Sequence, residues 1–150
     1  MLGLKKNPKN NQAIGRSKGG LSTKINATCD ALGNPTGFHL TPGQAHDLEG
    51  SDALMEYLTQ AAAVLADRAY DVDERMRQKL SERDCEAVIP FKKNRLISYT
   101  YDKEVYKARH LIENFFAKLK QYRAIATRYD KTSQNFLGAI YIAASLILLN

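Results

Sequence analysis

The chain has 150 residues, 44% of them hydrophobic, so it is about the size of one domain and has enough apolar side chains for a core. Its first residues are basic and polar, so we expect no signal peptide. Its two cysteines and three histidines show no disulfide or zinc-ligand spacing, so we expect a cytoplasmic protein with no disulfide and no zinc site. The net charge of +6 comes from two basic segments, residues 1–24 and 91–131, that flank an acidic middle. Basic segments favour nucleic acid as a partner. The same charge pattern is also typical of a basic tail plus a solvated helix.

Residues 1–12 are polar, basic and poor in apolar side chains, which predicts a flexible arm. The next segment, 13–24, combines three glycines with the basic residues Arg16, Lys18 and Lys24. A glycine-rich basic loop can bring backbone N–H groups close to a phosphate. From these residues alone, an ordinary flexible lead-in to a strand is the preferred interpretation.

Apolar runs then predict a β-hairpin followed by alternating helices and strands. The hairpin has strands over 21–30 and 36–40, and the later elements are a helix over 48–60 capped by Asp47, a buried strand over 62–66, a helix over 71–83, a buried strand over 87–90, a basic loop over 91–103 and a helix over 104–122. This order is typical of an α/β domain with a mixed sheet. The last segment, 136–149, is almost wholly apolar but too short for a membrane span of ~20 residues, so it predicts a buried helix or one that docks on a partner segment.

Four residues of the predicted helix 104–122 share one face. Their spacing is Y-x2-R-x3-E-x6-K, and they are Tyr106, Arg109, Glu113 and Lys120. At roughly 100° per residue they fall within a stripe about 60° wide, and the apolar residues of the helix fall elsewhere. The stripe puts a carboxylate between two cations and a phenol, which suits a metal ion beside a phosphate, although two-faced helices are common on protein surfaces.

Asp67 is the second candidate for chemistry. It follows the apolar run 61–66 at the end of a predicted buried strand, where ligand and metal sites of α/β sheets cluster. Two carboxylates from distant parts of a chain can hold Mg²⁺, and two such ions about 4 Å apart can activate a water or a 3′-hydroxyl in phosphodiester chemistry. That chemistry normally needs a third carboxylate. The alternative role for Asp67 is to cap the next turn or to pair with Arg68.

These residues resemble the DDE transposases of bacterial insertion sequences. The segment 66–71, ADRAYD, is similar to their A-D-K/R-A/G-Y-D/G motif, and the four-residue stripe matches their Y-x2-R-x3-E-x6-K signature at every position. The segments 15–25 and 41–47 resemble the family's glycine-rich and T-P-G loops, and 123–131 matches the stretch that follows the glutamate helix. The resemblance covers about residues 13–149 and is closest to the IS-Four and IS-Five-like group.

The resemblance implies a ribonuclease H-like fold, dependence on Mg²⁺ with Mn²⁺ as a substitute, and DNA transposition by cleavage and transfer of strands. It assigns Asp67 and Glu113 as the second and third catalytic carboxylates and as metal ligands. Lys120 would contact a DNA phosphate near the scissile bond, and Tyr106 and Arg109 would position substrate or orient Glu113. The implied partners are insertion-sequence ends, target DNA and a second copy in a homodimer, with no membrane, and the implied location is the bacterial nucleoid.

Two basic regions complete the expected DNA-binding set. The first is the glycine-rich segment with Arg16, Lys18 and Lys24. The second is the loop 91–103, which mixes two tyrosines with basic residues and could lie against a DNA strand, although its tyrosines have ordinary packing as an alternative role.

The family's first aspartate has no counterpart in this sequence. It would lie on a strand before the glycine-rich loop, whereas the first acidic residue here is Asp30, which has no family match. We therefore expect residues 13–150 to form a catalytic domain that is incomplete at its N-terminus, with the first strand missing. The chain would be either a frameshift product completed by an upstream-frame product, or a decayed copy. In both cases we expect no transposition by the chain alone, and the alternative function is an inactive fragment that binds DNA or transposase as an inhibitor.

Overall fold

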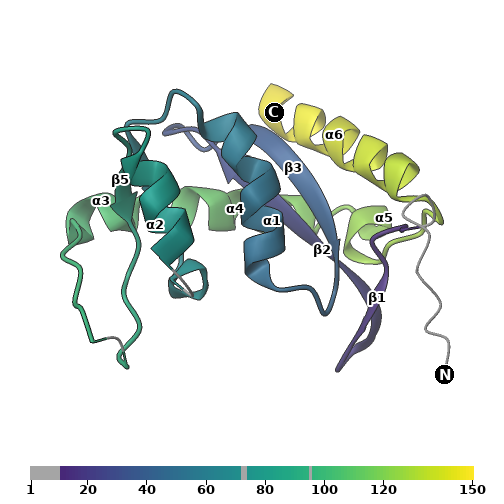
Figure 1. Ribbon diagram of the computed structural model, residues 1–150. Coiled ribbons are helices and arrows are strands. Elements are labelled where there is room, and N and C mark those ends of the chain that lie inside the picture. Colours follow the sequence, from purple (N-terminus) through teal and green to yellow (C-terminus); the bar gives the residue numbers. More distant parts are fainter. Residues whose placement is uncertain (1–10, 72–73, 95) are drawn as a thin grey trace, which may run out of the picture.

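A computed structural model describes residues 11–71, 74–94 and 96–150 of the chain (Figure 1), so the predicted flexible arm lies almost wholly outside the described residues. The elements in chain order are β1 (Gly15–Ser17), β2 (Gly20–Cys29), β3 (Pro35–Pro42), α1 (Asp47–Leu54), the 3-10 helix η2 (Met55–Leu58), β4 (Ala63–Leu65), the 3-10 helix η3 (Arg68–Tyr70), α2 (Glu74–Ser81), β5 (Glu86–Val88), α3 (Lys103–Lys107), α4 (His110–Leu119), α5 (Arg123–Ala126) and α6 (Ser133–Leu149).

The predicted hairpin is confirmed as β2 and β3, and its turn is held by Asp30. The Asp30 carboxylate accepts hydrogen bonds from the backbone N–H groups of Leu32 and Asn34, both at 2.9 Å. These bonds, chiefly the one from the Asn34 backbone, lower the pKa of Asp30 below its ordinary value. Gly33 has a φ of 86°, which glycine adopts without strain, and a side chain there would meet Leu111 of α4. The turn therefore anchors the hairpin to α4.

The described strands form two sheets, whereas the sequence predicts one mixed sheet. The first is antiparallel in the order β1-β2-β3, and the second is a parallel pair of β4 and β5. From Thr23 to Cys29, β2 pairs only with β3 among the described residues. The α/β class is confirmed, but no described strand pairs with both β2 and β4 to join the sheets.

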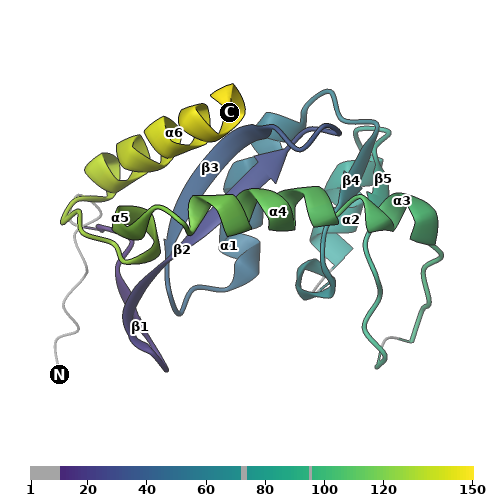
Figure 2. The same ribbon diagram turned by 180° about the vertical axis from the view of Figure 1, so that it is seen from behind.

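Each sheet has its own hydrophobic core. The core of the antiparallel sheet lies between β3, α4, α5 and α6, and its buried members are Phe38, Phe115, Leu119, Ile125, Phe136, Ile140, Ala143 and Ala144. The core of the parallel pair is smaller and is made of Met55, Val64, Met76, Leu80, Cys85 and Ile89. In Figure 2, α4 runs from the side of α5 to the side of α3; it packs against β2 and α6, whereas α1 packs against β2, β3 and η3. Helix α1 therefore links the two halves.

Three predicted helices differ in detail. The helix predicted over 48–60 is α1 followed by the tighter η2, and Asp47 is its first residue rather than its cap, because its carboxylate pairs with Lys24 at 3.0 Å. The helix predicted over 71–83 is observed as α2, from Glu74 to Ser81. The helix predicted over 104–122 is divided into α3 and α4 by a tight turn.

The C-terminal segment forms the long helix α6, which buries only one side. Phe136, Ile140 and Ala143 face the core, whereas Ile142 is 67% exposed and Leu149 is 82% exposed. A helix that lies on the outside of a sheet can bury one stripe only, so the predicted buried helix is half-buried. Among the described residues, no helix is long and apolar enough to cross a membrane.

Candidate active site

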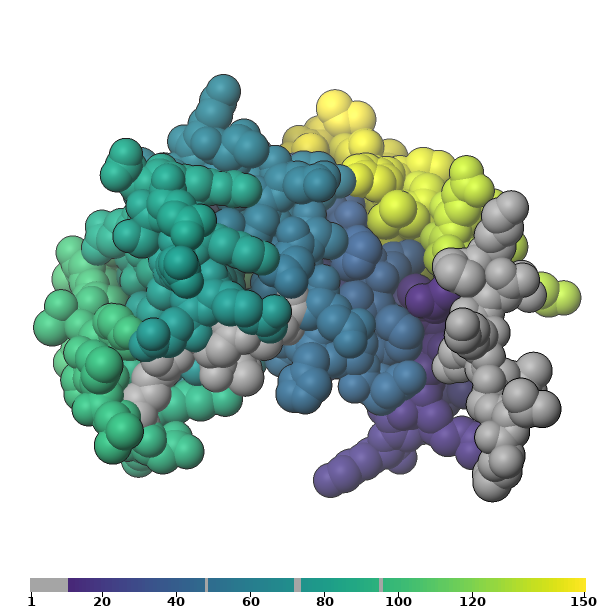
Figure 3. Space-filling model, viewed as in Figure 1, coloured from purple at the N-terminus to yellow at the C-terminus, as the bar shows by residue number. Residues whose placement is uncertain are grey.

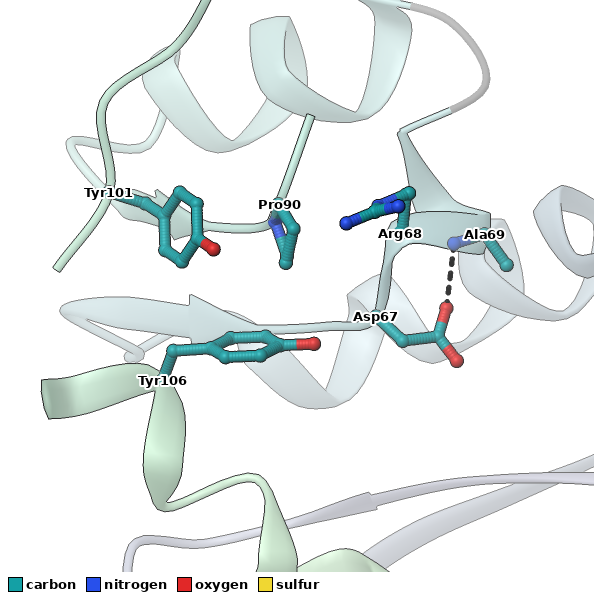
Figure 4. A pocket seen from close by; sticks show the side chains of 6 residues that line it. All are labelled: Asp67, Arg68, Ala69, Pro90, Tyr101 and Tyr106. Carbon is teal, nitrogen blue, oxygen red and sulfur yellow. Dashed lines mark hydrogen bonds between the residues drawn. The ribbon is translucent and has the colours of Figure 1, made fainter. Parts of the chain in front are cut away.

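Asp67 stands at the end of β4, as the sequence predicts, and begins the 3-10 helix η3. Its backbone is extended, with φ of −77° and ψ of 171°, and its carboxylate accepts a hydrogen bond from the backbone N–H of Ala69 at 2.8 Å. This bond fixes one oxygen and leaves the other directed away from the turn (Figure 4). The side chain is 45% exposed, so Asp67 both caps the turn and remains open to a ligand.

Arg109 brings the two predicted catalytic carboxylates together. Its Nη1 atom lies 3.8 Å from Oδ2 of Asp67, and its Nη2 atom donates a hydrogen bond to Oε1 of Glu113. Asp67 and Glu113 are separated by more than forty positions along the chain, yet they share one guanidinium group. The two candidate side chains therefore lie on either side of one arginine.

The turn between α3 and α4 determines where Arg109 lies. The N–H groups of Ala108 and Arg109 bond to the carbonyls of Val105 and Tyr106, three residues back, at 3.0 Å each. Bonds of this kind tighten the chain relative to an α-helix, which explains why the predicted single helix is divided here. The Arg109 guanidinium also lies 5.8 Å from the centre of the Tyr106 ring, so three of the four signature residues meet at this joint.

A shallow pocket of about 450 Å³ opens beside Asp67. Figure 4 shows the six residues that line it, which are Asp67, Arg68, Ala69, Pro90, Tyr101 and Tyr106. The rings of Tyr101 and Tyr106 meet edge to face, with centres 5.5 Å apart. The pocket thus combines a carboxylate, a cation and two aromatic faces, a set that suits a nucleotide.

Tyr70 lies in the 3-10 helix η3, close to Asp67. Burial raises its pKa to about 12, and the nearby carboxylates of Asp47 and Asp67 add to the rise because they disfavour a phenolate. Tyr70 is therefore a neutral phenol at physiological pH and packs against the core of the parallel pair.

The remaining predicted DNA-binding residues lie farther away. Lys120 follows the last turn of α4 and is exposed, about 10 Å along the helix axis from Glu113 at 1.5 Å per residue. Arg16 and Lys18 lie on the exposed hairpin of β1 and β2. Lys24 is different, because its amine donates to the Ala45 carbonyl at 2.7 Å and to Asp47 at 3.0 Å. It fastens the loop before α1, and its predicted DNA contact stays a prediction.

The oxygen donors of this site fit a hard divalent cation in type. Asp67 and Glu113 supply two carboxylates, and Arg109 now neutralises both. Among the residues that the structure describes, no group of three or more histidine, cysteine or acidic side chains is placed to hold a metal ion. The site therefore brings together two carboxylates, one fewer than two-metal phosphodiester chemistry normally uses.

Sequence reasoning missed a buried ion pair that supports the site. Asp71, the last residue of the ADRAYD segment, is 1% exposed and accepts hydrogen bonds from Arg77 Nε and from the Lys92 backbone N–H, both at 2.9 Å. Arg77 in turn donates to the Ile89 carbonyl at 2.8 Å and lies 4.3 Å from the centre of the Tyr99 ring. The sequence predicts that Asp71 begins a helix as its cap. Its place in the ADRAYD segment is the one sequence signal that could have pointed to a further role for this carboxylate.

Comparison with known proteins agrees with this geometry. Residues 3–148 match the family model described as the transposase DDE domain. The chain is 38% identical over 129 residues to a putative transposase for insertion sequence element IS6501 from Brucella ovis, covering 86% of this chain and 99% of the relative. It is 31% identical over 129 residues to the transposase for insertion sequence element IS1106 from Neisseria meningitidis serogroup B, covering 83% of this chain but only 42% of that longer protein.

No solved structure matches the chain. The family match extends over nearly the whole chain and includes both carboxylates that meet at Arg109. Members of this family use divalent metal ions and act on DNA, by cleaving and transferring its strands. The chain therefore belongs to the DDE transposase family of insertion sequences, whose function is DNA transposition.

Proposed function

We propose that Asp67 and Glu113 are catalytic carboxylates and metal ligands of this transposase. The observation that carries the proposal is their convergence on Arg109 from β4 and α4. The same two side chains present oxygen atoms of the type that Mg²⁺ or Mn²⁺ takes as ligands.

The remaining signature residues have positioning roles in this proposal. A bound divalent ion would activate the attacking water or 3′-hydroxyl and stabilise the leaving oxygen. With Asp67 and Glu113 as metal ligands, Arg109 would be available to a DNA phosphate, and its planar guanidinium suits bidentate contacts with phosphate. Tyr106 and Tyr101 offer aromatic faces to a nucleotide beside Asp67. Lys120 neutralises a phosphate farther along the strand.

We further propose that a ribonuclease H-like sheet forms when one more strand lies between β2 and β4. From Thr23 to Cys29, β2 has an edge that no described strand occupies, and among the described strands β4 pairs only with β5; one strand inserted there would merge the two sheets. That strand would supply the third carboxylate, and an upstream-frame product is the source we favour. The much greater length of the Neisseria relative is consistent with additional segments in a complete enzyme. Residues 13–150 would then be one part of a catalytic domain that works as a homodimer at the nucleoid.

A cleavage assay tests these assignments. The 150-residue chain and a fusion to the upstream-frame product are incubated with labelled duplex DNA that carries an insertion-sequence end, with Mg²⁺, with Mn²⁺ or with EDTA. We expect metal-dependent cleavage by the fusion only, and its loss in Asp67→Asn and in Glu113→Gln. Glu104→Gln is the matched control, because Glu104 is an exposed carboxylate of α3 that pairs with Lys107. Cleavage that persists in Glu113→Gln would contradict the catalytic assignment, and cleavage by the 150-residue chain alone would contradict the need for another strand.

A further inference from the structure

The hairpin of β1 and β2, residues 15–22, has features that the proposed active site does not use. Its strands pair as Gly15 with Ser22, Arg16 with Leu21 and Ser17 with Gly20. In Figures 1 and 3 it extends away from the body of the molecule as a narrow projection. We propose that this hairpin is an arm that contacts duplex DNA several base pairs from the cleavage site, with Leu21 as an apolar contact and with Arg16 and Lys18 as phosphate-binding cations.

The hairpin is held by its own hydrogen bonds. Ser17 Oγ donates to the Gly20 carbonyl at 3.2 Å, and Ser22 Oγ donates to Ser17 Oγ at 3.0 Å. Gly20 has a φ of 104°, a conformation that favours glycine and closes the tight turn. A hairpin fixed in this way keeps its shape without contributing to a core, so its exposed side chains are available to a partner.

The hairpin carries one large apolar side chain that the described part of the chain leaves exposed. Leu21 is 72% exposed and belongs to neither hydrophobic core. It lies directly across the hairpin from Arg16, so an apolar side chain and a cation form one cross-strand pair. A two-stranded ribbon is narrow enough to enter the major groove of DNA, where apolar side chains contact thymine methyl groups.

The charge of the hairpin matches a polyanion. Arg16 and Lys18 are exposed, make no ion pair among the described residues, and belong to a 24-residue segment that contains no acidic residue. Lys24, by contrast, is already neutralised by Asp47. The unpaired cations of the hairpin therefore keep their full charge for phosphate groups.

The position of the hairpin connects it to the active site. In Figure 2, α4 runs from the side of the hairpin and α5 to the side of α3, where Arg109 and Glu113 lie. Lys120 stands at the end of α4 that is nearer α5. A duplex placed along α4 would pass the carboxylates first, then Lys120, and then the hairpin. The arm would thus hold DNA several base pairs from the bond that is cut.

This inference rests on the proposed function, because it takes DNA as the substrate of the same site. The test measures binding of the 150-residue chain to a fluorescein-labelled 30-base-pair duplex of mixed sequence by anisotropy at several NaCl concentrations. The variants are Arg16→Gln with Lys18→Gln, Leu21→Ala, and Lys120→Gln. The control is Lys118→Gln, because Lys118 is exposed on the same helix but about 200° around it from Lys120 at 100° per residue.

We expect the double variant to lower the slope of log K against log salt by about 2, since each lost phosphate contact removes about 0.9. Leu21→Ala should weaken binding severalfold with an unchanged slope, because it removes no charge. Lys118→Gln should leave affinity close to that of the parent chain. Thermal unfolding of every variant should be unchanged, because the altered side chains are exposed.

The outcomes separate the two proposals. If the parent chain binds DNA and Lys120→Gln weakens binding, but the double variant and Leu21→Ala bind as the parent chain does, the arm is wrong and the active-site proposal stands. If the parent chain shows no salt-dependent binding to the duplex, the arm is wrong, and the active-site proposal is decided separately by cleavage with the fusion and its Asp67→Asn and Glu113→Gln variants.

Discussion

Removal of the buried charge at Asp71 should destabilise the protein far more than the loss of any exposed ion pair. The Asp71 side chain is completely buried, and its partner Arg77 is 11% exposed. Breaking a buried pair by changing one partner typically costs about 3–5 kcal/mol, because the other charge stays buried without compensation. Asp71→Asn keeps the shape and one oxygen acceptor, so we expect the lower end of that range, about 3 kcal/mol. At ~2–4 °C for each kcal/mol in a domain of this size, the melting temperature should fall by about 6–12 °C.

The control is Glu104→Gln, which breaks the exposed pair between Glu104 and Lys107. Their side chains are 79% and 71% exposed, and such pairs contribute about 0.5 kcal/mol or less, so the melting temperature should change by less than ~2 °C. Both variants are compared with the parent chain by circular dichroism during heating at pH 7. The reasoning is refuted if Asp71→Asn melts within the range of the Glu104→Gln control.

Three other perturbations have opposite or selective outcomes. Gly50→Ala in α1 should destabilise the protein by about 1–3 kcal/mol, because the new methyl group would lie within 2.4 Å of a buried asparagine of β2. Gly138→Ala in α6 faces open space and should stabilise the protein by about 0.5–1 kcal/mol. Urea unfolding measures both changes. Between about pH 10 and 12 the unfolded chain loses the Tyr70 proton that the folded chain keeps, so the free energy of unfolding should fall as pH rises. Tyr70→Phe should remove the part of this fall that Tyr70 causes. Urea titrations of both chains at pH 9 and 11 measure the difference. Burial raises the pKa of both cysteine thiols, so exposure decides their order: a thiol reagent at pH 8 should modify the half-buried Cys29 before Cys85, which is 6% exposed, and equal rates would contradict the burial.

The sequence predicts the positions of the catalytic candidates better than the path of the chain between them. Asp67 follows a buried strand and Glu113 lies on an amphipathic helix, and both patterns are local, so both are confirmed. The break between α3 and α4, just before His110, contains no glycine or proline that would predict it. It coincides with the tertiary contact from Arg109 to Asp67. Local periodicity contains no information about such a contact.

The same limit explains why the buried ion pair of Asp71 was missed and why one mixed sheet was predicted. An aspartate just before a helical pattern is typical of a cap, and its burial depends on Arg77 and Lys92, which lie farther along the chain. Strand pairing likewise depends on which edges meet in three dimensions, so a list of strands does not distinguish one mixed sheet from two separate sheets. Sequence patterns alone therefore do not predict the role of a residue when that role depends on partners far along the chain.

The division into two hydrophobic cores has a consequence for cooperativity. Each half has its own core, and the links between them are α1 and the ion pair of Arg109 with Asp67. Halves joined in this way can open at different free energies, so amide hydrogen exchange should report two levels of protection rather than one. Insertion of a strand between β2 and β4 would couple the halves into one cooperative unit. Catalytic competence and full cooperativity would then arise in the same assembly step, and a chain that had not completed that step would be unable to cut DNA.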